Sequence, residues 1–172
     1  RKLKTLEKKA GDIREDIIDM LVEAGSGHSA GPLGMADIFT ALYFHILVHD
    51  PKKPMWKDRD RLILSSGHIA PVRYAAMAHA GYFPKKLLMT LRKLGSPLQG
   101  HPEREYMEAL ETTSGPLGEG LAQAVGIAYA GLMDRSPWRV YCVTGDGELN
   151  EGIAWESLMF AGVNKLYNLT FI

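Results

Sequence analysis

The sequence predicts an α/β fold, a parallel sheet with helices on both faces, in which all 172 residues form a single domain. Residues 61–66 (RLILSS) and 139–144 (RVYCVT) are short apolar runs without alternation, which is typical of strands buried on both faces. Segments with helical patterns separate the two runs. Because strands buried on both faces alternate with helices, we expect them to pair in parallel.

The first half of the chain predicts two helices before the first strand. Residues 3–24 place apolar side chains three or four positions apart, as on one stripe of an amphipathic helix. The following segment, 26–32 (SGHSAGP), contains Pro32 and has glycines on either side, so we expect it to be non-helical. A second helix is predicted over 35–48, ending before the His-Asp-Pro sequence at 49–51.

The remaining elements continue the alternation. Helices are predicted over 71–80 and 84–94, followed by a long glycine-containing loop. An alanine-rich helix is expected over 121–133, and another helix follows the second strand and ends near Val163. The last residues, 168–172 (NLTFI), begin a third strand. Since the chain stops inside this strand, we expect the polypeptide to continue beyond it.

The composition excludes several classes of protein. Twenty basic residues balance twenty acidic ones, so the net charge gives no reason to expect nucleic acid or an anionic membrane as a partner. No apolar run approaches the roughly eighteen residues that a membrane span requires. The single cysteine, Cys142, lies in a predicted buried strand, which excludes a disulfide framework and suggests a reducing compartment.

Two polar segments directly follow the predicted buried strands. Residues 65–68 (SSGH) follow the first strand, and residues 144–147 (TGDG) follow the second. Ligands of parallel α/β sheets bind at the carboxyl ends of the strands, so this position favours a binding role for Asp146. The alternative is a simple turn, because Asp-Gly is also a common turn dipeptide.

Three of the six histidines directly follow a glycine: His28, His68 and His101. Composition alone predicts about 0.6 such pairs. A preceding glycine lets the backbone approach a ligand and leaves the imidazole free to point at it. Three unrelated surface histidines remain the alternative. His45 and His49 have the i, i+4 spacing of a helical metal pair, but no third ligand is evident and we expect an exposed helix face.

A glycine-rich loop, residues 112–120 (TTSGPLGEG), precedes the alanine-rich helix. Backbone N–H groups at such a helix start attract anions. The loop does not fit the dinucleotide-binding pattern, because no strand immediately precedes it.

Five motifs in this order resemble the transketolase family of thiamine diphosphate enzymes, and together they span nearly the whole chain. They are SGHSAGPLG (26–34), RDRLILSSGH (59–68), KLGSPLQGHP (93–102), TTSGPLGEG (112–120) and GDGELNEG (145–152). The chain is similar to the N-terminal, diphosphate-binding domain of that family, which in some organisms is a separate subunit.

The resemblance implies a cofactor site for thiamine diphosphate. Asp146 is expected to ligate Mg²⁺ or Ca²⁺, which bridges to the diphosphate, since hard cations prefer oxygen ligands. The Gly147 backbone N–H and His68 are expected to bind the same diphosphate. The remaining cofactor-binding residues implied are Gly115, Pro116 and Leu117, which line the pocket of the ring system, together with Gly145, Glu148 and Glu151.

The resemblance also implies catalytic roles and partners. His28 and His101 are expected to face the reacting carbons, hydrogen-bond substrate hydroxyls and move protons. Glu151 resembles a family acid in a network that joins two active sites across a subunit interface. The implied activity is transfer of a two-carbon ketol unit from a ketose phosphate to an aldose phosphate, in the cytoplasm and within the pentose phosphate pathway. The implied assembly is a homodimer or heterotetramer with a C-terminal domain or subunit that carries the pyrimidine-binding part.

This sequence departs from the family pattern in places. The family usually has glutamine where Glu119 stands, so we expect Glu119 to point away from the diphosphate. The metal-ligating asparagine is expected just past Ile172, and the general acid belongs to the other domain, so the chain alone is expected to be inactive. Two alternatives remain: a different thiamine diphosphate enzyme, such as deoxyxylulose phosphate synthase or the alpha chain of a 2-oxo acid dehydrogenase, and a non-catalytic binding module.

Overall fold

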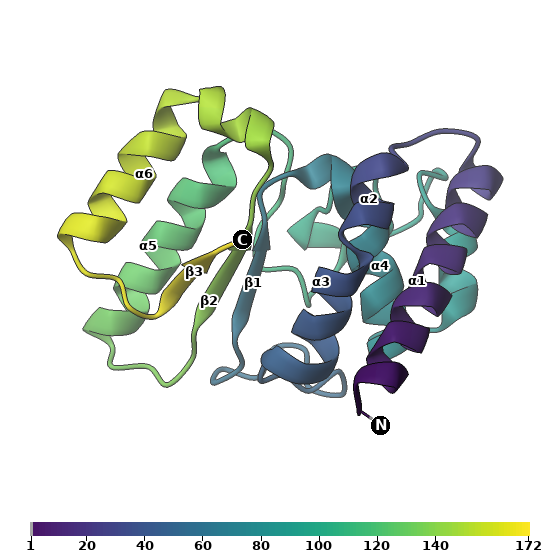
Figure 1. The fold of residues 1–172 in the computed structure, drawn as a ribbon, viewed down its shortest axis with the longest axis horizontal. Helices are drawn as coiled ribbons and strands as arrows, with labels where there is room; N and C mark the ends of the chain where they lie inside the picture. Colours follow the sequence, from purple (N-terminus) through teal and green to yellow (C-terminus); the bar gives the residue numbers. More distant parts are fainter. Residues whose placement is uncertain (1) are drawn as a thin grey trace. The chain divides into compact units, whose positions relative to one another are not determined.

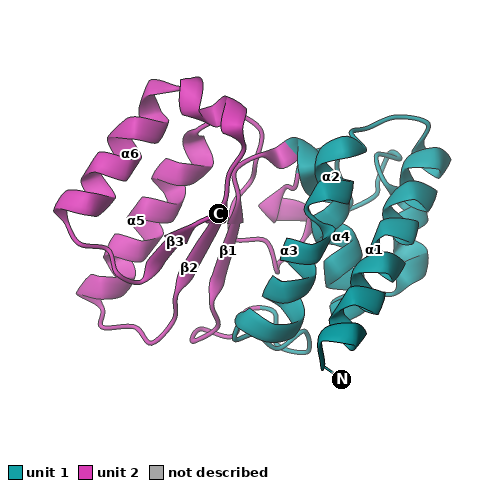
Figure 2. Cartoon of the chain, in the orientation of Figure 1, with its two compact units in different colours: residues 1–54, 68–101 teal, residues 55–67, 102–172 magenta. Residues whose placement is uncertain are grey.

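The computed structural model describes residues 2–172, which divide into two compact units (Figure 2). Unit 1 comprises the described residues up to Pro54 together with His68–His101. Unit 2 comprises Met55–Gly67 and Pro102–Ile172. The organisation of the whole chain as a single domain stays a prediction.

Unit 2 contains a three-stranded parallel sheet (Figure 1). Its strands are β1 (Arg61–Leu64), β2 (Val140–Val143) and β3 (Leu169–Phe171), in the order β1-β2-β3. In the register, Ile63 lies opposite Cys142, and Cys142 lies opposite Phe171. All three predicted strands are present and parallel, so the predicted α/β class is confirmed.

Two helices of unit 2 flank β2 in the sequence and share a core with the sheet. Helix α5 (Glu119–Met133) precedes β2, helix α6 (Gly152–Val163) follows it, and α5 packs against α6 and the strands. The buried core of unit 2 draws on both helices and the sheet: it contains Ile63, Leu121, Ala124, Val125, Ala128, Val140, Cys142, Ala154 and Leu166. This apolar packing fixes the ends of β1 and β2, from which the candidate site is built.

Unit 1 is helical. Helix α1 (Lys2–Ala24) buries Ala10, Ile13, Ile17 and Met20, at the spacing predicted for one stripe, and packs on α3 (Ala36–Ala41) and α4 (Ala70–Ala80). The shorter elements of this unit are α2 (Ala30–Gly34), the π-helix η1 (Leu42–Ile46) and the 3-10 helix η3 (Lys85–Thr90). Among residues 2–172, no helix combines the length and apolar character needed to cross a membrane.

Two sequence-based predictions about helix positions in unit 1 were wrong. Pro32 lies inside helix α2 at its third position, where a missing N–H is tolerated because the first-turn donors have no intrahelical partner. The helix expected over 84–94 is only the 3-10 helix η3. Thr90 donates its hydroxyl to the carbonyl of Leu87, and Arg92 adopts a positive φ of 62°, so the backbone turns instead of continuing.

Candidate functional site

The segments that follow β1 and β2 lie against each other in unit 2. The β1–β2 ladder continues one residue past the strands, because the backbone N–H of Ser65 donates to the carbonyl of Val143 at 2.9 Å. Gly145 approaches Ser66 so closely that a Cβ atom on Gly145 would lie 2.7 Å from the Ser66 hydroxyl oxygen. The two polar segments predicted at the strand ends therefore meet.

Asp146 and Gly147 open the 3-10 helix η5 (Asp146–Asn150), and both are exposed. The space beside Gly147 is open, since a Cβ atom built there would have no neighbour within 4 Å. A carboxylate and an uncovered backbone thus stand together at the end of β2. This arrangement leaves room for a charged ligand to approach the backbone closely.

The glycine-rich loop before α5 is fixed to the sheet on one side. The Ser114 hydroxyl donates to the carbonyl of Leu64 at 2.5 Å, at the last residue of β1. Gly118 has a positive φ of 85°, and a Cβ atom on it would lie 2.8 Å from Cγ2 of Ile153 in α6. Between these two fixed points, Gly115 is half-buried while Pro116 and Leu117 are exposed. The residues predicted to bind the ring system of the ligand are therefore accessible to solvent, in a loop that is fixed at both ends.

Glu148 is the one acidic residue of this segment that is buried, with a relative exposure of 1%. Its Oε1 accepts hydrogen bonds from the Ser65 hydroxyl (2.5 Å) and the Gly118 backbone N–H (2.8 Å). Its Oε2 accepts from the Ser66 hydroxyl and the Gly145 backbone N–H, both at 2.8 Å. The bond to Gly145 is the side-chain half of a capping box at the start of η5. The carboxylate thus contacts all three segments of the candidate site.

Sequence reasoning did not find the two serines as partners of Glu148. A signal was present, since two adjacent hydroxyls directly follow a buried strand and an acidic residue stands three positions after a glycine. Buried hydroxyls need hydrogen-bond partners, and a carboxylate is the acceptor that satisfies both at once.

Glu151 and Glu119 occupy helix starts. Glu151 precedes the first residue of α6 and is exposed, and its Cβ lies 3.1 Å from where a Cβ atom on Gly118 would be. Glu119 is the first residue of α5 and is exposed as well. Carboxylates at helix N-termini interact favourably with the helix dipole.

In unit 1 the structure brings together two of the three histidines that follow a glycine. The ring centroids of His28 and His68 lie 5.0 Å apart, with the ring planes inclined at 53°. Close packing also occurs next to these rings, since a Cβ atom on Gly31 would lie 2.7 Å from Cγ2 of Ile69. His28 is exposed and His68 is half-buried, so a polar group could reach both rings.

His101, the third of these histidines, follows a loop of unit 1 that makes hydrogen bonds to the rest of the unit. The Tyr74 hydroxyl donates to the carbonyl of Gln99 at 2.9 Å, and the Arg92 backbone N–H donates to the carbonyl of Leu98 at 2.9 Å. His101 itself is exposed. Hydrogen bonds hold the backbone just before His101, and its catalytic role stays a prediction.

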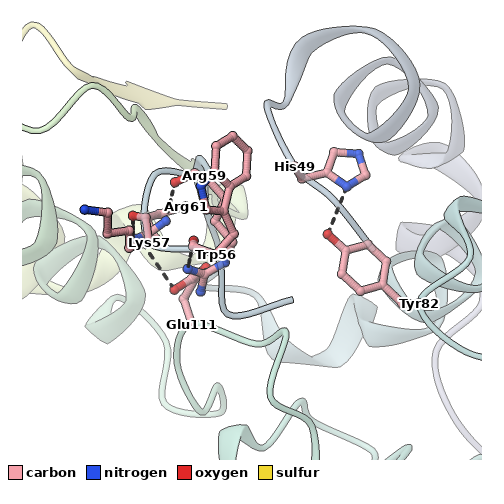
Figure 3. A network of polar contacts seen from close by, with 7 residues as sticks. All are labelled: His49, Trp56, Lys57, Arg59, Arg61, Tyr82 and Glu111. Atoms are coloured by element: carbon pink, nitrogen blue, oxygen red, sulfur yellow. Dashed lines mark hydrogen bonds and ion pairs between the residues drawn. The ribbon is translucent and has the colours of Figure 1, made fainter. Parts of the chain in front are cut away.

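His49 does not lie on an exposed helix face as predicted. It follows the π-helix η1 and is half-buried, with Nδ1 2.9 Å from the hydroxyl of Tyr82 (Figure 3). Its Nε2 lies 2.8 Å from the carbonyl oxygen of Tyr43. Its ring also stacks on Tyr82, with centroids 5.6 Å apart. Both ring nitrogens are used by protein partners, so His49 has a structural role in unit 1.

The donor set for a metal is incomplete in the described part of the chain. Residues 2–172 contain no group of three or more His, Cys, Asp or Glu side chains that could hold an ion. At the end of β2, Asp146 offers one exposed carboxylate. A divalent cation such as Mg²⁺ needs several fixed oxygens, so these residues alone do not form its site.

Cys142 lies in β2 beneath this site and is fully buried. Its Sγ lies 3.7 Å from the carbonyl of Gly120. Burial, and secondly the negative charge of Glu148, raise the pKa of the Cys142 thiol. The cysteine therefore acts as a small apolar residue of the core and not as a nucleophile.

A parallel sheet with a carboxylate and glycine-rich loops at its strand ends defines the class of an α/β domain that binds a phosphate-bearing ligand. The chain matches the family profile described as transketolase, thiamine diphosphate binding domain, over residues 6–172. It belongs to this family, as the five motifs in the sequence indicated.

Curated relatives agree with this assignment. The chain is 42% identical over 164 residues to the 6-deoxy-6-sulfo-D-fructose transketolase subunit SqwG of Clostridium sp. (strain MSTE9), covering 95% of this chain and 60% of that protein. It is 41% identical to an apulose-4-phosphate transketolase subunit from Actinobacillus succinogenes, covering 97% of this chain and 61% of that protein. Human transketolase is 40% identical over an aligned region of 173 positions, which covers 100% of this chain and 28% of the enzyme.

Solved structures show the same fold. Transketolase from Leishmania mexicana superposes with a TM-score of 0.91 at 37% identity, over 96% of this chain and 26% of that one. Transketolase from Campylobacter jejuni gives a TM-score of 0.90 at 38% identity, over 98% of this chain and 28% of that one. The chain therefore spans less than two thirds of the length of these relatives.

Proposed function

We propose that the chain is the diphosphate-binding part of a transketolase and works together with a C-terminal part. The observation that carries this proposal is the meeting of three polar segments in unit 2: the segment after β1, the glycine-rich loop before α5, and the segment with Asp146 and Gly147. Each segment matches a family motif at the position where an α/β sheet binds its ligand.

The residues present fit a bound diphosphate. Gly147 leaves its backbone uncovered, and Gly145 lies where a Cβ atom would strike the Ser66 hydroxyl oxygen. We propose that the N–H of Gly147 and the imidazole of His68 bind the diphosphate, with Gly145 shaping the loop. Gly115, Pro116 and Leu117, together with Glu151, are proposed to contact the remainder of thiamine diphosphate.

Asp146 is the proposed protein ligand of a divalent ion, Mg²⁺ or Ca²⁺. Its exposed carboxylate supplies one oxygen, and the diphosphate supplies others. We propose that the remaining ligands come from protein outside residues 2–172. In this proposal metal and cofactor bind together, because neither alone completes the ion's oxygen shell.

Bound thiamine diphosphate supplies the electron sink for breaking and forming a carbon–carbon bond next to a carbonyl. The protein contributes position and proton transfer. We propose that His28 and His101, both exposed, hydrogen-bond substrate hydroxyls and move protons at those oxygens.

The proposed reaction moves a two-carbon ketol unit from a ketose phosphate to an aldose phosphate. Two of the relatives are called transketolase subunits in their names, which supports a partner that carries the pyrimidine-binding part. We propose a homodimer or heterotetramer that works in the cytoplasm and the pentose phosphate pathway. Phosphorylated sugars are the proposed substrates, with no nucleic acid or membrane partner.

Calorimetric titration tests this function. Thiamine diphosphate is titrated with Mg²⁺ into the full-length protein combined with its C-terminal part, and saturable heat is expected. The variant Asp146→Asn, which keeps the shape and removes the charge, is expected to weaken the Mg²⁺-dependent binding at least about tenfold. Absence of binding by the wild type would refute the proposal.

A substrate assay separates the alternatives. The same preparation is offered a ketose phosphate with an aldose phosphate acceptor, and separately pyruvate. Transfer with the sugar pair alone is expected. Turnover of pyruvate alone would point to another thiamine diphosphate enzyme, and turnover of neither would favour a binding module.

A further inference from the structure

Glu148 combines deep burial with a complete set of protein partners. At 1% exposure its carboxylate is removed from water, yet it accepts four hydrogen bonds within unit 2. An ionised carboxylate offers about four acceptor sites on its two oxygens. Ser65 and Gly118 occupy Oε1, and Ser66 and Gly145 occupy Oε2, so no site remains for a ligand.

These four donors come from parts of the sequence that are far apart. Ser65 and Ser66 precede Glu148 by more than eighty positions, and Gly118 precedes it by thirty. Gly118 ends the glycine-rich loop, while Gly145 is the neighbour of Asp146. A single side chain therefore connects the segment after β1, the start of α5 and the start of η5.

We propose that Glu148 is a positioning residue: it holds the glycine-rich loop and the Asp146–Gly147 segment in their binding arrangement without touching the cofactor. This inference rests on the proposed function and revises the direct cofactor contact expected for Glu148. It also explains why the carboxylate of Glu148 turns inward while that of Asp146, two residues earlier, is exposed.

The hydrogen-bond chemistry explains why another residue would not replace Glu148. Two of the donors are backbone N–H groups and two are hydroxyls, so the site requires a group that only accepts. Glutamine keeps the shape but presents its NH₂ to at least one backbone N–H, which leaves that donor unsatisfied. Buried donors without a partner are unfavourable, and the loops are expected to move until water satisfies them.

The test compares Glu148→Gln with the wild type in the full-length protein combined with its C-terminal part. Hydrogen exchange is measured without cofactor over residues 115–121 and 142–149, and then the Kd of thiamine diphosphate is measured with Mg²⁺. Faster exchange in at least one of these segments is expected, with unchanged exchange in α1. The Kd is expected to rise about tenfold or more, as for losing a hydrogen bond to a charged group.

Matched variants keep the test decisive. Glu156→Gln removes the same charge from an exposed position on α6 and is expected to change neither measurement. Ser65→Ala and Ser66→Ala each remove one donor and leave the carboxylate in place, so each is expected to raise the Kd less than Glu148→Gln does. Should Glu148→Gln fail to fold, the two serine variants provide the same comparison.

Two results would overturn the proposal. One is unchanged exchange over 115–121 and 142–149 in Glu148→Gln with a weakened Kd, which would indicate direct cofactor contact. The other is faster exchange spread evenly through both units, which would indicate a general stability role. If the wild type bound no thiamine diphosphate, the proposed function would fail, while the exchange comparison would still decide whether Glu148 holds the loops.

Discussion

Gly120 and Ser65 approach so closely that a Cβ atom on Gly120 would lie 2.5 Å from the Cα of Ser65. This contact places the first turn of α5 directly on the segment after β1, within unit 2. Real Cβ atoms do not come this close to a backbone carbon, so a side chain here forces the helix and the strand end apart.

Gly120→Ala is therefore expected to destabilise unit 2. Alanine is normally the better helix residue, but the clash with backbone atoms is expected to dominate and lower the free energy of unfolding by about 1–3 kcal/mol. Urea unfolding measures this difference. The variant should also weaken thiamine diphosphate binding, since α5 starts at the proposed cofactor loop.

Gly11→Ala is the control for this prediction. Gly11 lies in the middle of α1, and a Cβ atom there would have no neighbour within 4 Å. Without a clash, the helix preference of alanine is expected to stabilise the protein by about 0.5–1 kcal/mol. Equal effects of the two substitutions would contradict the steric argument.

A buried ion pair within unit 2 gives a second prediction. Arg59 donates from Nη2 to Oε1 of Glu111 at 2.7 Å, and their side chains are only 8% and 11% exposed (Figure 3). Glu111→Gln is expected to destabilise the protein by about 3 kcal/mol, because it leaves the Arg59 guanidinium buried without its counter-charge. Urea unfolding again provides the measurement.

The exposed pair of Arg14 and Asp37 in unit 1 is the matched control. The hydrogen bond from Arg14 lowers the pKa of the Asp37 carboxyl, so the stabilisation is present at neutral pH and is lost as the pH falls through that lowered pKa. Because these side chains are 36% and 66% exposed, Asp37→Asn is expected to destabilise by less than about 1 kcal/mol at neutral pH. A larger loss from Asp37→Asn than from Glu111→Gln would contradict the role of burial.

Much of the fold could be predicted from the sequence where one local signal dominates. The apolar stripe of α1 and the apolar runs of β1 and β2 predicted the ends of these elements to within one or two residues. The expected helix over 84–94 failed because tertiary and side-chain bonds decided it: Thr90 pairs with Ser96 as well as with the Leu87 carbonyl. Such competition depends on residues that meet only after folding, and no periodicity reveals it.

Part of the candidate site could likewise be predicted from the sequence, and part could not. The positions of Asp146 and Gly147 followed from the strand that precedes them, since ligand sites of parallel sheets lie at strand ends. The environment of Glu148 did not follow, because its partners at Ser65 and Gly118 are distant in sequence. The sequence alone does not distinguish the buried carboxylate of Glu148 from the exposed carboxylate of Asp146, two positions earlier.

Thiol reactivity provides a third prediction. The raised pKa and full burial of Cys142 keep its sulfur protonated and out of contact with solvent. A disulfide reagent such as Ellman's reagent is expected to leave Cys142 unmodified in the native protein and to react with it once the protein is unfolded in urea. Rapid modification of Cys142 in the native state would contradict its burial in β2.

His28 gives the last prediction, which concerns proton transfer and not cofactor affinity. His28 is exposed and lies beside His68, so His28→Ala removes an imidazole without opening a buried core. The kcat for ketol transfer is expected to fall about a hundredfold or more, as for loss of a general acid or base, while the Kd of thiamine diphosphate changes little. His45→Ala is the control, since His45 is also exposed in unit 1 and contacts only Lys2 among the hydrogen bonds observed for it. An unchanged kcat in His28→Ala would exclude a role for His28 at the reacting carbons, and so would an equal loss of kcat in His45→Ala. A weakened Kd of thiamine diphosphate with a normal kcat would instead assign His28 to cofactor binding together with His68.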